Sequence, residues 1–486
     1  MPSDVSRALA DSRRGMVVAP AGCGKTYLLA ESVACSSGRQ LVLTHTHAGV
    51  RAIRGHLERQ RVPSVKYRVI TIDGFALRYA SAFPTLSQWA VSMPTGDDWK
   101  TLRESTHRLL CTSAIRRVLS VTYSGVYVDE YQDCSIAQHR LILTLAEIMP
   151  VRVVGDPLQA IFALLDREEY CRWQDVEATF TLVGELNTPH RWNAHNTALG
   201  TWLKDVRRLL VEGADIDLRN TPAIWKQSTQ QKDQARLNAC FGVKAEKEHS
   251  LVAMRKWRPE CHRLARNLKG RFRAIETVEC DELLEWSQRI EVAKGVPRIV
   301  SLLEFADLCM SGLPAAVKQL GDRLAEGKPP KPQRSDYKIV LKALENVRDN
   351  GDLQLVLDAM AALTAIEHRL VMARHELWRE MKRSLREHRA NPSSSLRQTA
   401  WNLRNRLRHV GSKIDRASLA TPLLVKGLEF DHALILDADD HAEAESLYVA
   451  MTRGSRSLTI VSDNPVLRRS KPHYMRNCDE SKSLES

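Results

Sequence analysis

The sequence predicts an α/β protein built on parallel sheets. Over the first 190 residues, short apolar segments alternate with amphipathic ones, which is typical of a parallel sheet covered by helices on both faces. Strand-like segments return after Ser250 and at residues 433–436 and 458–461, whereas residues 295–417 have helical periodicity almost throughout. A chain of 486 residues is long enough for more than one hydrophobic core. We therefore expect two α/β domains, the second interrupted by a largely helical insertion.

The first domain is expected to span residues 1–190. Its strands are predicted near residues 16–20, 41–44, 69–72, 125–129 and 151–155. Two prolines and a helical stretch from Trp99 to Leu119 interrupt this order, which predicts a small insertion at about 84–124. The rest is predicted to comprise a first part of the second domain (191–294), the helical insertion (295–417), a closing part (418–465) and a polar tail (466–486).

Composition narrows the class of protein. The chain is 43% hydrophobic but has no apolar run long enough for a membrane span, so we expect no membrane association. Its ten cysteines include no Cys-x-x-Cys pair, which argues against a zinc ribbon or an iron–sulfur site. Reduced thiols in a cytoplasmic protein are the natural interpretation. The net charge of +13 favours a polyanionic partner, with nucleic acid as the first candidate.

A phosphate-binding loop is predicted between the first strand and the helix that follows it. The loop reads Ala-Pro-Ala-Gly-Cys-Gly-Lys-Thr, and its backbone N–H groups and helix N-terminus attract phosphate. The Lys25 ammonium neutralises the terminal phosphate, and the Thr26 hydroxyl is a ligand for Mg²⁺. The residues expected to contact the nucleotide here are Ala19, Pro20, Ala21, Gly22, Cys23, Gly24, Lys25, Thr26 and Tyr27.

Two acids, Asp129 and Glu130, follow the apolar segment 126–128. Asp129 is placed to hold Mg²⁺ through water, and Glu130 to orient and deprotonate an attacking water. Each pattern alone has a simpler explanation, because Gly-Lys-Thr occurs by chance and Asp-Glu after a strand is often a solvated turn. Together they predict a nucleotide triphosphatase with ATP and Mg²⁺ as cofactors.

Eight segments in this order resemble the motifs of UvrD/Rep/PcrA-type superfamily-1 DNA helicases. The resemblance implies two RecA-like P-loop domains with ATP between them, single-stranded DNA across the top, and 3′ to 5′ movement. The segments that carry it are residues 19–26, 44–48, 71–76, 129–133, 154–162, 186–192 and 426–431, followed by a final arginine motif at 447–453.

The resemblance also implies roles for individual residues. Gln159 takes the place of the residue that senses the terminal phosphate, and Arg191 and Arg453 would stabilise the charge of the transition state, an effect of roughly 10³–10⁵ in rate. Surface salt bridges are the alternative for these arginines. His190, Gly427 and Glu429 are expected at the nucleotide, although Glu429 also fits a helix-start acid. The positions expected to contact single-stranded DNA are Thr44, His45, Thr46, His47, Thr71, Asp73, Phe75 and Phe162, with core packing as the alternative for the two aromatic rings.

The chain departs from the family at several of these positions. Residues 1–21 contain no adenine-reading glutamine, His190 replaces an aromatic residue that stacks on adenine, and Asp73 replaces a histidine. Leu423 stands where the late signature is commonly preceded by a histidine, and residues 163–166 replace an expected Arg-Gly-Ala. Nucleotide choice and coupling to DNA therefore remain open.

Two functions are compatible with these residues. The first is an ATP-dependent 3′ to 5′ helicase or translocase on single-stranded DNA. The compact form resembles GajB, the helicase-like subunit of Gabija antiphage defence, whose partner is an OLD-family nuclease. The second function is suggested by the reduced insertions and by the altered residues Asp73, Leu423 and Ala163. It is a regulatory ATPase subunit that senses DNA or nucleotides and controls a partner nuclease, with little unwinding of its own.

A basic segment lies within the predicted helical insertion. Residues 366–416 contain thirteen lysines or arginines against five acids, a net charge of +8, together with Trp378 and Trp401. This charge suggests a surface for duplex DNA or for a protein partner. The alternative is the solvated face of two long helices.

Overall fold

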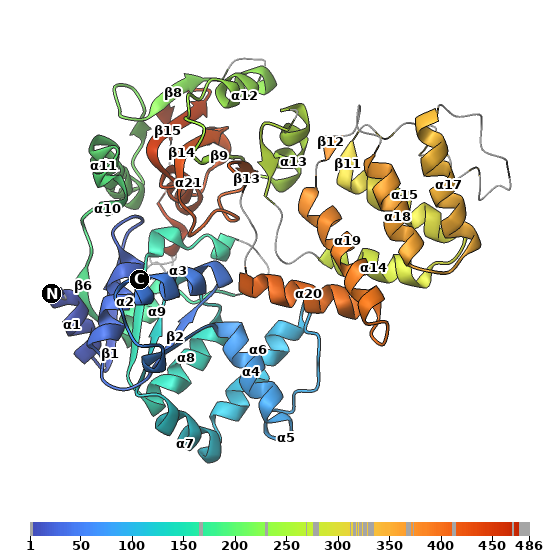
Figure 1. Cartoon of the computed structure of the whole chain (residues 1–486). Coiled ribbons are helices and arrows are strands. Elements are labelled where there is room, and N and C mark those ends of the chain that lie inside the picture. The colour runs from blue at the N-terminus through green and yellow to red at the C-terminus, as the bar shows by residue number, and fades with distance from the viewer. Residues whose placement is uncertain are drawn as a thin grey trace, which may run out of the picture. The chain divides into compact units, whose positions relative to one another are not determined.

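The computed structural model describes most of the chain. They are residues 3–164, 169–228, 232–268, 270–275, 281–311, 335–365, 371–372, 374–410, 415–468 and 471–475, with the single positions 313, 317, 319, 323 and 328. The chain forms two compact units, of which the first comprises Met1–Lys256 with Thr421–Ser486 and the second comprises Trp257–Ala420 (Figure 1).

The first unit contains a six-stranded sheet in the order β3-β2-β4-β5-β1-β6. Every neighbouring pair in it is parallel. The five strands predicted for this part of the chain are confirmed to within two residues, and a sixth, β6, was not predicted. The strands are β1 (Arg14–Val18), β2 (Gln40–Thr44), β3 (Tyr67–Thr71), β4 (Gly125–Val128), β5 (Val151–Gly155) and β6 (Thr181–Glu185).

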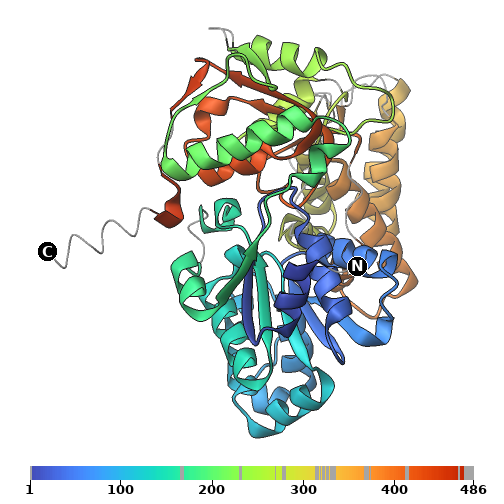
Figure 2. The same ribbon diagram turned by 90° about the vertical axis from the view of Figure 1, so that its left-hand side faces the viewer.

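Helices cover both faces of this sheet. Because successive side chains of a strand point to opposite faces, neighbouring residues of one strand are buried against different helices. Val17 and Val42 pack with helices of residues 4–11, 25–35 and 47–59 on one face, whereas Met16 and Leu43 pack with helices of residues 72–82, 98–110, 113–122, 136–148 and 173–179 on the other. Figure 2 shows these strands between helices on both sides. The helices of this part are α1 (Asp4–Asp11), α2 (Lys25–Cys35), α3 (His47–Arg59), α4 (Ile72–Ala82), α5 (Pro84–Ser87), α6 (Asp98–Leu110), α7 (Ser113–Thr122), α8 (Ile136–Ile148) and α9 (Trp173–Thr179).

The segment predicted as a small insertion forms α5, α6 and α7. Its own apolar cluster joins Ala76 and Ala80 of α4 to Trp89 and to Leu102 of α6. This cluster attaches the insertion to the sheet through α4, so it extends the first core rather than forming a separate one.

The first unit also contains four strands of a second parallel sheet, in the order β9-β14-β15-β8. We call the part of this unit built on β1 to β6 the first half, and the part built on these four strands the second half. The strands are β8 (Ile224–Gln227), β9 (Leu251–Met254), β14 (Phe430–Leu436) and β15 (Gly454–Ser462). The helices are α10 (His190–Asn193), α11 (Thr197–Glu212), α12 (Lys232–Phe241) and α21 (Ala444–Met451), and β7 (Ile216–Asp217) pairs antiparallel with β16 (Val466–Leu467).

The second unit is largely helical. Its core is a cluster of apolar side chains around Phe305 and Trp378, whose rings stack with centroids 5.6 Å apart. Its helices are α13 (Arg258–Asn267), α14 (Asp281–Val292), α15 (Val296–Cys309), α17 (Ser335–Asp349), α18 (Gln354–Thr364), α19 (His375–Ala390) and α20 (Leu396–Val410). Its short strands are β10 (Arg273–Ala274), which is parallel to β13 (Ala417–Ala420), and β11 (Met310–Ser311), which is antiparallel to β12 (Val371–Met372).

The predicted helical insertion at 295–417 includes residues that are not described, among them 314–316, 324–327 and 329–334. Most of the predicted polar tail at 466–486 likewise lies outside the described residues. Within the described part of the chain, no helix is both long enough and apolar enough to cross a bilayer.

Candidate nucleotide-binding site

The predicted phosphate loop joins β1 to α2 in the first half. Gly22 and Gly24 adopt φ values of +72° and +87°, a backbone region that favours glycine. A Cβ atom on Gly22 would lie 2.6 Å from the ring of Trp192, so the loop is also closely packed. α2 starts at Lys25, and no described side chain caps its first turn. The free N–H groups of that turn suit an anion.

The acids Asp129 and Glu130 follow β4, which is separated from β1 only by β5. The carboxyl ends of parallel strands lie at one edge of a sheet, so the loop after β1 and the acids after β4 meet there. Glu130 adopts φ +55° and its Oε2 lies 2.6 Å from Lys25 Nζ. The structure therefore brings the predicted lysine and the predicted general base into direct contact.

Burial and neighbouring charges separate the acidities of the two carboxyl groups. Burial and then the charge of Glu130 raise the pKa of Asp129. Burial acts in the same direction on Glu130, but the charges of Lys25 and Lys426 outweigh it and lower the pKa of Glu130. Buried Asp129 Oδ1 has no hydrogen-bond partner among the described residues. A buried carboxylate oxygen without a hydrogen-bond partner is well suited to bind a cation.

The residues present fit Mg²⁺. Asp129 and Thr26 would supply the oxygen ligands that this ion prefers, with water and phosphate completing its shell. No group of three or more His, Cys, Asp or Glu side chains that could hold a metal ion occurs in the described ranges. When bound, Mg²⁺ neutralises charge on the phosphates.

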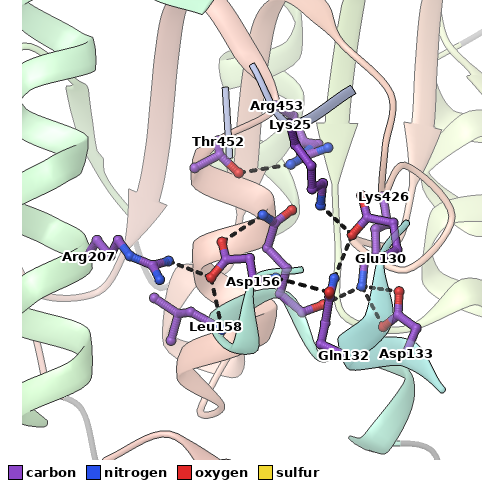
Figure 3. Close-up of polar contacts among 11 residues, drawn as sticks. Lys25, Glu130, Gln132, Asp133, Asp156, Leu158, Arg207, Lys426, Thr452 and Arg453 are labelled. Carbon is purple, nitrogen blue, oxygen red and sulfur yellow. Dashed lines mark hydrogen bonds and ion pairs between the residues drawn. The ribbon is translucent and has the colours of Figure 1, made fainter. Parts of the chain in front are cut away.

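Gln132 connects the acidic turn to the turn after β5. Its Nε2 donates to Glu130 Oε2 at 2.5 Å, and its Oε1 accepts from the backbone N–H of Asp156 at 3.0 Å. Asp156 Oδ2 in turn accepts from Gln159 Nε2 at 2.7 Å. Figure 3 shows this network around Glu130. The predicted phosphate sensor, Gln159, is therefore linked to the predicted general base through two side chains.

The second half contributes Lys426 to the same network. Lys426 Nζ donates to both carboxylate oxygens of Asp133 and to the main-chain carbonyl of Gln159. It also lies 5.4 Å from the centroid of the Phe162 ring. Lys426 is thus a cation near the acids that comes from the other half of the unit.

Arg191 and Arg453, the two predicted charge-stabilising arginines, lie close together but differ in their contacts. Arg191 donates to the Thr452 carbonyl and, at 2.5 Å, to Glu429. Arg453 is 1% exposed and donates to the carbonyls of Val449 and Leu428. Burial, together with the charge of Arg191, lowers the pKa of Arg453 to about 9. In this structure Arg453 holds the turn before β14, while Arg191, whose side chain is 8% exposed, pairs with the 62% exposed Glu429.

Of the other predicted nucleotide contacts, His190 and Tyr27 lie at the phosphate loop. The ring of His190 lies 3.5 Å from the place of a Cβ on Gly24, and Tyr27 is 52% exposed. Gly427 has φ +77°. Glu429 has a 62% exposed side chain, and although burial opposes it, the charge of Arg191 lowers the pKa of Glu429. These positions leave two rings and one carboxylate accessible beside the loop.

The eight residues predicted to contact DNA differ in their burial and in their contacts. Thr46 caps α3 and Thr71 caps α4, each accepting a backbone N–H at 3.0 Å. Thr44 and Phe75 are buried at 1% and 2% exposure, so Phe75 follows the core-packing alternative. Asp73 pairs with Arg103 at 2.8 Å. Of the eight candidates, Thr46 is exposed, whereas His45, His47, Asp73 and Phe162 are partly exposed.

Five residues of this network, Lys426 among them, had no assigned role in the sequence prediction. Gln132, Asp133 and Asp156 stand inside the acidic and phosphate-sensing motifs, so their polar character next to the predicted acids was a usable signal. Arg207 pairs with Asp156 at 2.8 Å, but in the sequence it is one arginine of an amphipathic helix, and nothing there distinguishes it from Arg208.

Comparison with known proteins gives a family match over part of the chain. A model of the UvrD/REP helicase N-terminal domain matches residues 90–166, which include the acidic turn and the turn after β5. No curated protein matches the sequence significantly.

Several solved helicases are similar in structure. The Pif1 helicase from Candida albicans matches with 13% identity and a TM-score of 0.41, covering 100% of both chains. A Bacteroides Pif1 helicase in complex with ADP-AlF3 and single-stranded DNA matches with 11% identity and a TM-score of 0.40, covering 100% of this chain and 98% of that one. Arterivirus nonstructural protein 10, a helicase solved with DNA, matches with 15% identity and a TM-score of 0.26. That match covers 51% of this chain, which spans about half of the arterivirus protein (49%).

Proposed function

We propose that the chain is an ATP-dependent helicase or translocase that moves 3′ to 5′ on single-stranded DNA. The observation that carries the proposal is the contact between Lys25 and Glu130 beside the unmatched carboxylate oxygen of Asp129. A phosphate-neutralising lysine, a base and a cation ligand at one sheet edge are the parts that phosphoryl transfer to water requires. The family match over residues 90–166 supports assigning this chemistry to a helicase.

Each residue has a role in this proposal. The loop N–H groups and Lys25 bind the β- and γ-phosphates, and Asp129 and Thr26 hold Mg²⁺. Glu130 takes the proton of the attacking water, and its lowered pKa keeps it ionised for that task at neutral pH. Gln159 senses the terminal phosphate of ATP. Arg191 and Arg453, from the second half, stabilise the negative charge of the transition state. His190, Tyr27 and Glu429 are placed for the base and ribose.

DNA is proposed to bind near the amino ends of α3 and α4. Thr46, His47 and Phe162 offer accessible hydroxyl, imidazole and aromatic groups there. Stacking of a base on such a ring is worth about 1–3 kcal/mol. Phosphate contacts would add a salt-dependent contribution, which the net charge of +13 favours.

The second candidate is a regulatory ATPase subunit that controls a nuclease, as in an antiphage defence complex with an OLD-family partner. The specific observation in its favour is that two predicted DNA contacts are engaged elsewhere. Asp73 is held by Arg103, and Phe75 is in the core. A chain with fewer DNA contacts than a processive helicase would suit a sensing role.

One experiment separates the two candidates. ATP hydrolysis is measured with and without single-stranded DNA over a salt series, and strand displacement is measured on duplexes with a 3′ tail or a 5′ tail. The helicase proposal expects stimulation by DNA that weakens as salt rises, and unwinding of the 3′-tailed duplex alone. Hydrolysis that is indifferent to single-stranded DNA at low salt would favour the regulatory subunit.

A further inference from the structure

Arg207 on α11 forms an ion pair with Asp156, the residue that follows β5. Arg207 Nη1 lies 2.8 Å from Asp156 Oδ1, and the side chains are 18% and 0% exposed (Figure 3). A fully buried carboxylate is costly without a cation or hydrogen bonds to compensate it. Arg207, from the second half of the unit, therefore compensates an acid of the first half.

Asp156 also accepts hydrogen bonds from the turn that follows it. Its Oδ1 accepts from the backbone N–H of Leu158 at 3.2 Å, and its Oδ2 accepts from Gln159 Nε2 at 2.7 Å. One N–H of the Gln159 amide is thereby fixed on Asp156, which directs the second N–H and the carbonyl oxygen elsewhere. The orientation of Gln159 depends on Asp156, and the position of Asp156 depends on Arg207.

The same acid is connected to the catalytic carboxylate. The backbone N–H of Asp156 donates to Gln132, which donates to Glu130, which contacts Lys25. A continuous chain of polar contacts thus runs from α11 to the phosphate loop. Displacement of Asp156 would therefore change the positions of the Gln159 and Glu130 side chains.

Arg207 is itself held in place by Tyr448 of α21. The guanidinium lies 5.4 Å from the centroid of the Tyr448 ring and hydrogen-bonds to its hydroxyl. Two helices of the second half, α11 and α21, therefore fix the arginine that reaches Asp156. Arg208, the next residue, instead pairs with Glu212 on its own helix and is 62% exposed.

We propose that Arg207 is a positioning residue that orients Gln159 through Asp156, so that the rate of hydrolysis depends on a contact between the two halves of the unit. The inference rests on the proposed ATPase function and adds to it a link between Arg207 of the second half and Gln159 of the first half. In this proposal Arg207 acts through Asp156 and Gln159 rather than by contacting the nucleotide. Without Arg207, Asp156 would lose the cation that compensates it, and Gln159 would be held less firmly.

The first test compares Arg207→Gln with the matched control Arg208→Gln in the full chain. Arg207→Gln should lower kcat for ATP roughly tenfold or more, since small misplacements of a reacting arrangement are costly in rate. KM for ATP, and the affinity for a fluorescent ATP analogue, should stay within about twofold because Arg207 makes no ground-state contact with the nucleotide. Arg207→Lys keeps the charge and should recover part of kcat, and Arg208→Gln should behave as wild type.

The second test asks whether Arg207 acts through Gln159. If it does, adding Arg207→Gln to a Gln159→Ala variant should lower kcat no further, because neighbouring residues in one chain of contacts are not additive. Additive losses, or equal kcat in the Arg207→Gln and Arg208→Gln variants, would overturn the proposal. If Arg207→Gln folds poorly, the double variant Arg207→Gln/Asp156→Asn replaces the ion pair with two neutral side chains. Its thermal midpoint of unfolding should return towards the wild-type value, while its kcat should stay low. Recovery of wild-type kcat in this double variant would contradict the positioning role of Arg207.

The wild-type protein separates this inference from the function on which it rests. A wild type without ATPase activity means that the proposed function fails, and the inference fails with it. An active wild type whose kcat is insensitive to Arg207→Gln means that only the inference fails.

Discussion

Lys426 and Asp133 form an almost fully buried ion pair, with side chains that are 6% and 2% exposed. The ammonium group contacts both carboxylate oxygens and also the main-chain carbonyl of Gln159. Lys426 precedes β14 in the second half, whereas Asp133 and Gln159 follow β4 and β5 in the first half. A single cation therefore ties the acidic turn and the phosphate-sensing turn of one half to the other.

Lys426→Met should destabilise the protein strongly, because it leaves Asp133 buried without a cation. Breaking a buried pair in this way costs about 3–5 kcal/mol. The measurement is the midpoint of thermal or denaturant unfolding. Lys232→Met is a matched control, since its pair with Asp463 has side chains that are 47% and 44% exposed and should contribute at most about 1 kcal/mol. Equal losses in the two variants would contradict the structural role of Lys426.

Lys25→Ala and Glu130→Gln should both stop ATP hydrolysis but for different reasons. Lys25→Ala removes the charge that balances the terminal phosphates, so ATP binding should weaken together with turnover. Glu130→Gln removes only the base, so ATP should still bind while the rate falls by roughly 10²–10⁴. Binding of a fluorescent ATP analogue and steady-state hydrolysis distinguish the two. Equal loss of binding in both variants would contradict the assigned roles.

The parts of the fold that the sequence predicted well are those where burial leaves a simple pattern. Strands β1, β2, β4 and β5 are covered on both faces, so each appears as a short apolar run. β6 was missed because none of its residues is fully buried and Leu182 is 49% exposed, which leaves no such run. The phosphate loop and the acids were found because their chemistry requires particular residues at particular places.

Contacts between distant side chains could not be predicted in the same way. Arg207 and Arg208 are adjacent on one helix, yet one reaches a buried acid fifty-one positions earlier in the chain and the other pairs with its own helix. Arg404 belongs to the basic segment 366–416 that was expected to form a binding surface, but it is paired with Glu380, and their side chains are 11% and 9% exposed. Trp378, counted in the same basic segment, belongs to the core of the second unit. Charge counts do not reveal which cations are buried.

Asp431 should stabilise the protein in a manner that depends on pH. Burial opposes ionisation, but the N–H and hydroxyl of Ser250 and the charge of Arg456 lower the pKa of Asp431 to about 2. An unfolded aspartate has a pKa of about 3.9, so this stabilisation is complete above that value and is lost as the pH falls through about 2.

Asp431→Asn should therefore lower the free energy of unfolding near pH 7, by roughly 1 kcal/mol after allowance for solvent screening. The difference between wild type and variant should shrink between about pH 4 and about pH 2. Unfolding of the two proteins is compared across that range. A difference that is the same at about pH 7 and about pH 3 would show that the carboxylate charge is not what stabilises the start of β14.

The basic segment of the second unit presents three arginines on one face of α19. Arg379 and Arg383 are 64% and 53% exposed, Arg386 is also exposed, and spacings of four and three residues place them in line. Such a row suits the phosphates of duplex DNA, each contact adding about one unit to the salt dependence of binding. The side chain of Arg408, which the sequence grouped with them, lies outside the described residues.

Replacing Arg379, Arg383 and Arg386 with glutamine should weaken duplex binding and lower its salt slope by up to about three units, one for each lost phosphate contact. Basal ATP hydrolysis should survive because no nucleotide motif is touched. Arg404→Gln should instead lower the thermal midpoint, since it leaves Glu380 buried without its cation. Arg289→Gln, which changes an exposed and paired arginine of the same unit, is the control. If duplex affinity and its salt slope are unchanged while a nuclease partner no longer co-purifies, the row is a docking surface. If neither changes, these arginines form a solvated helix face, and their charge has no bearing on DNA binding.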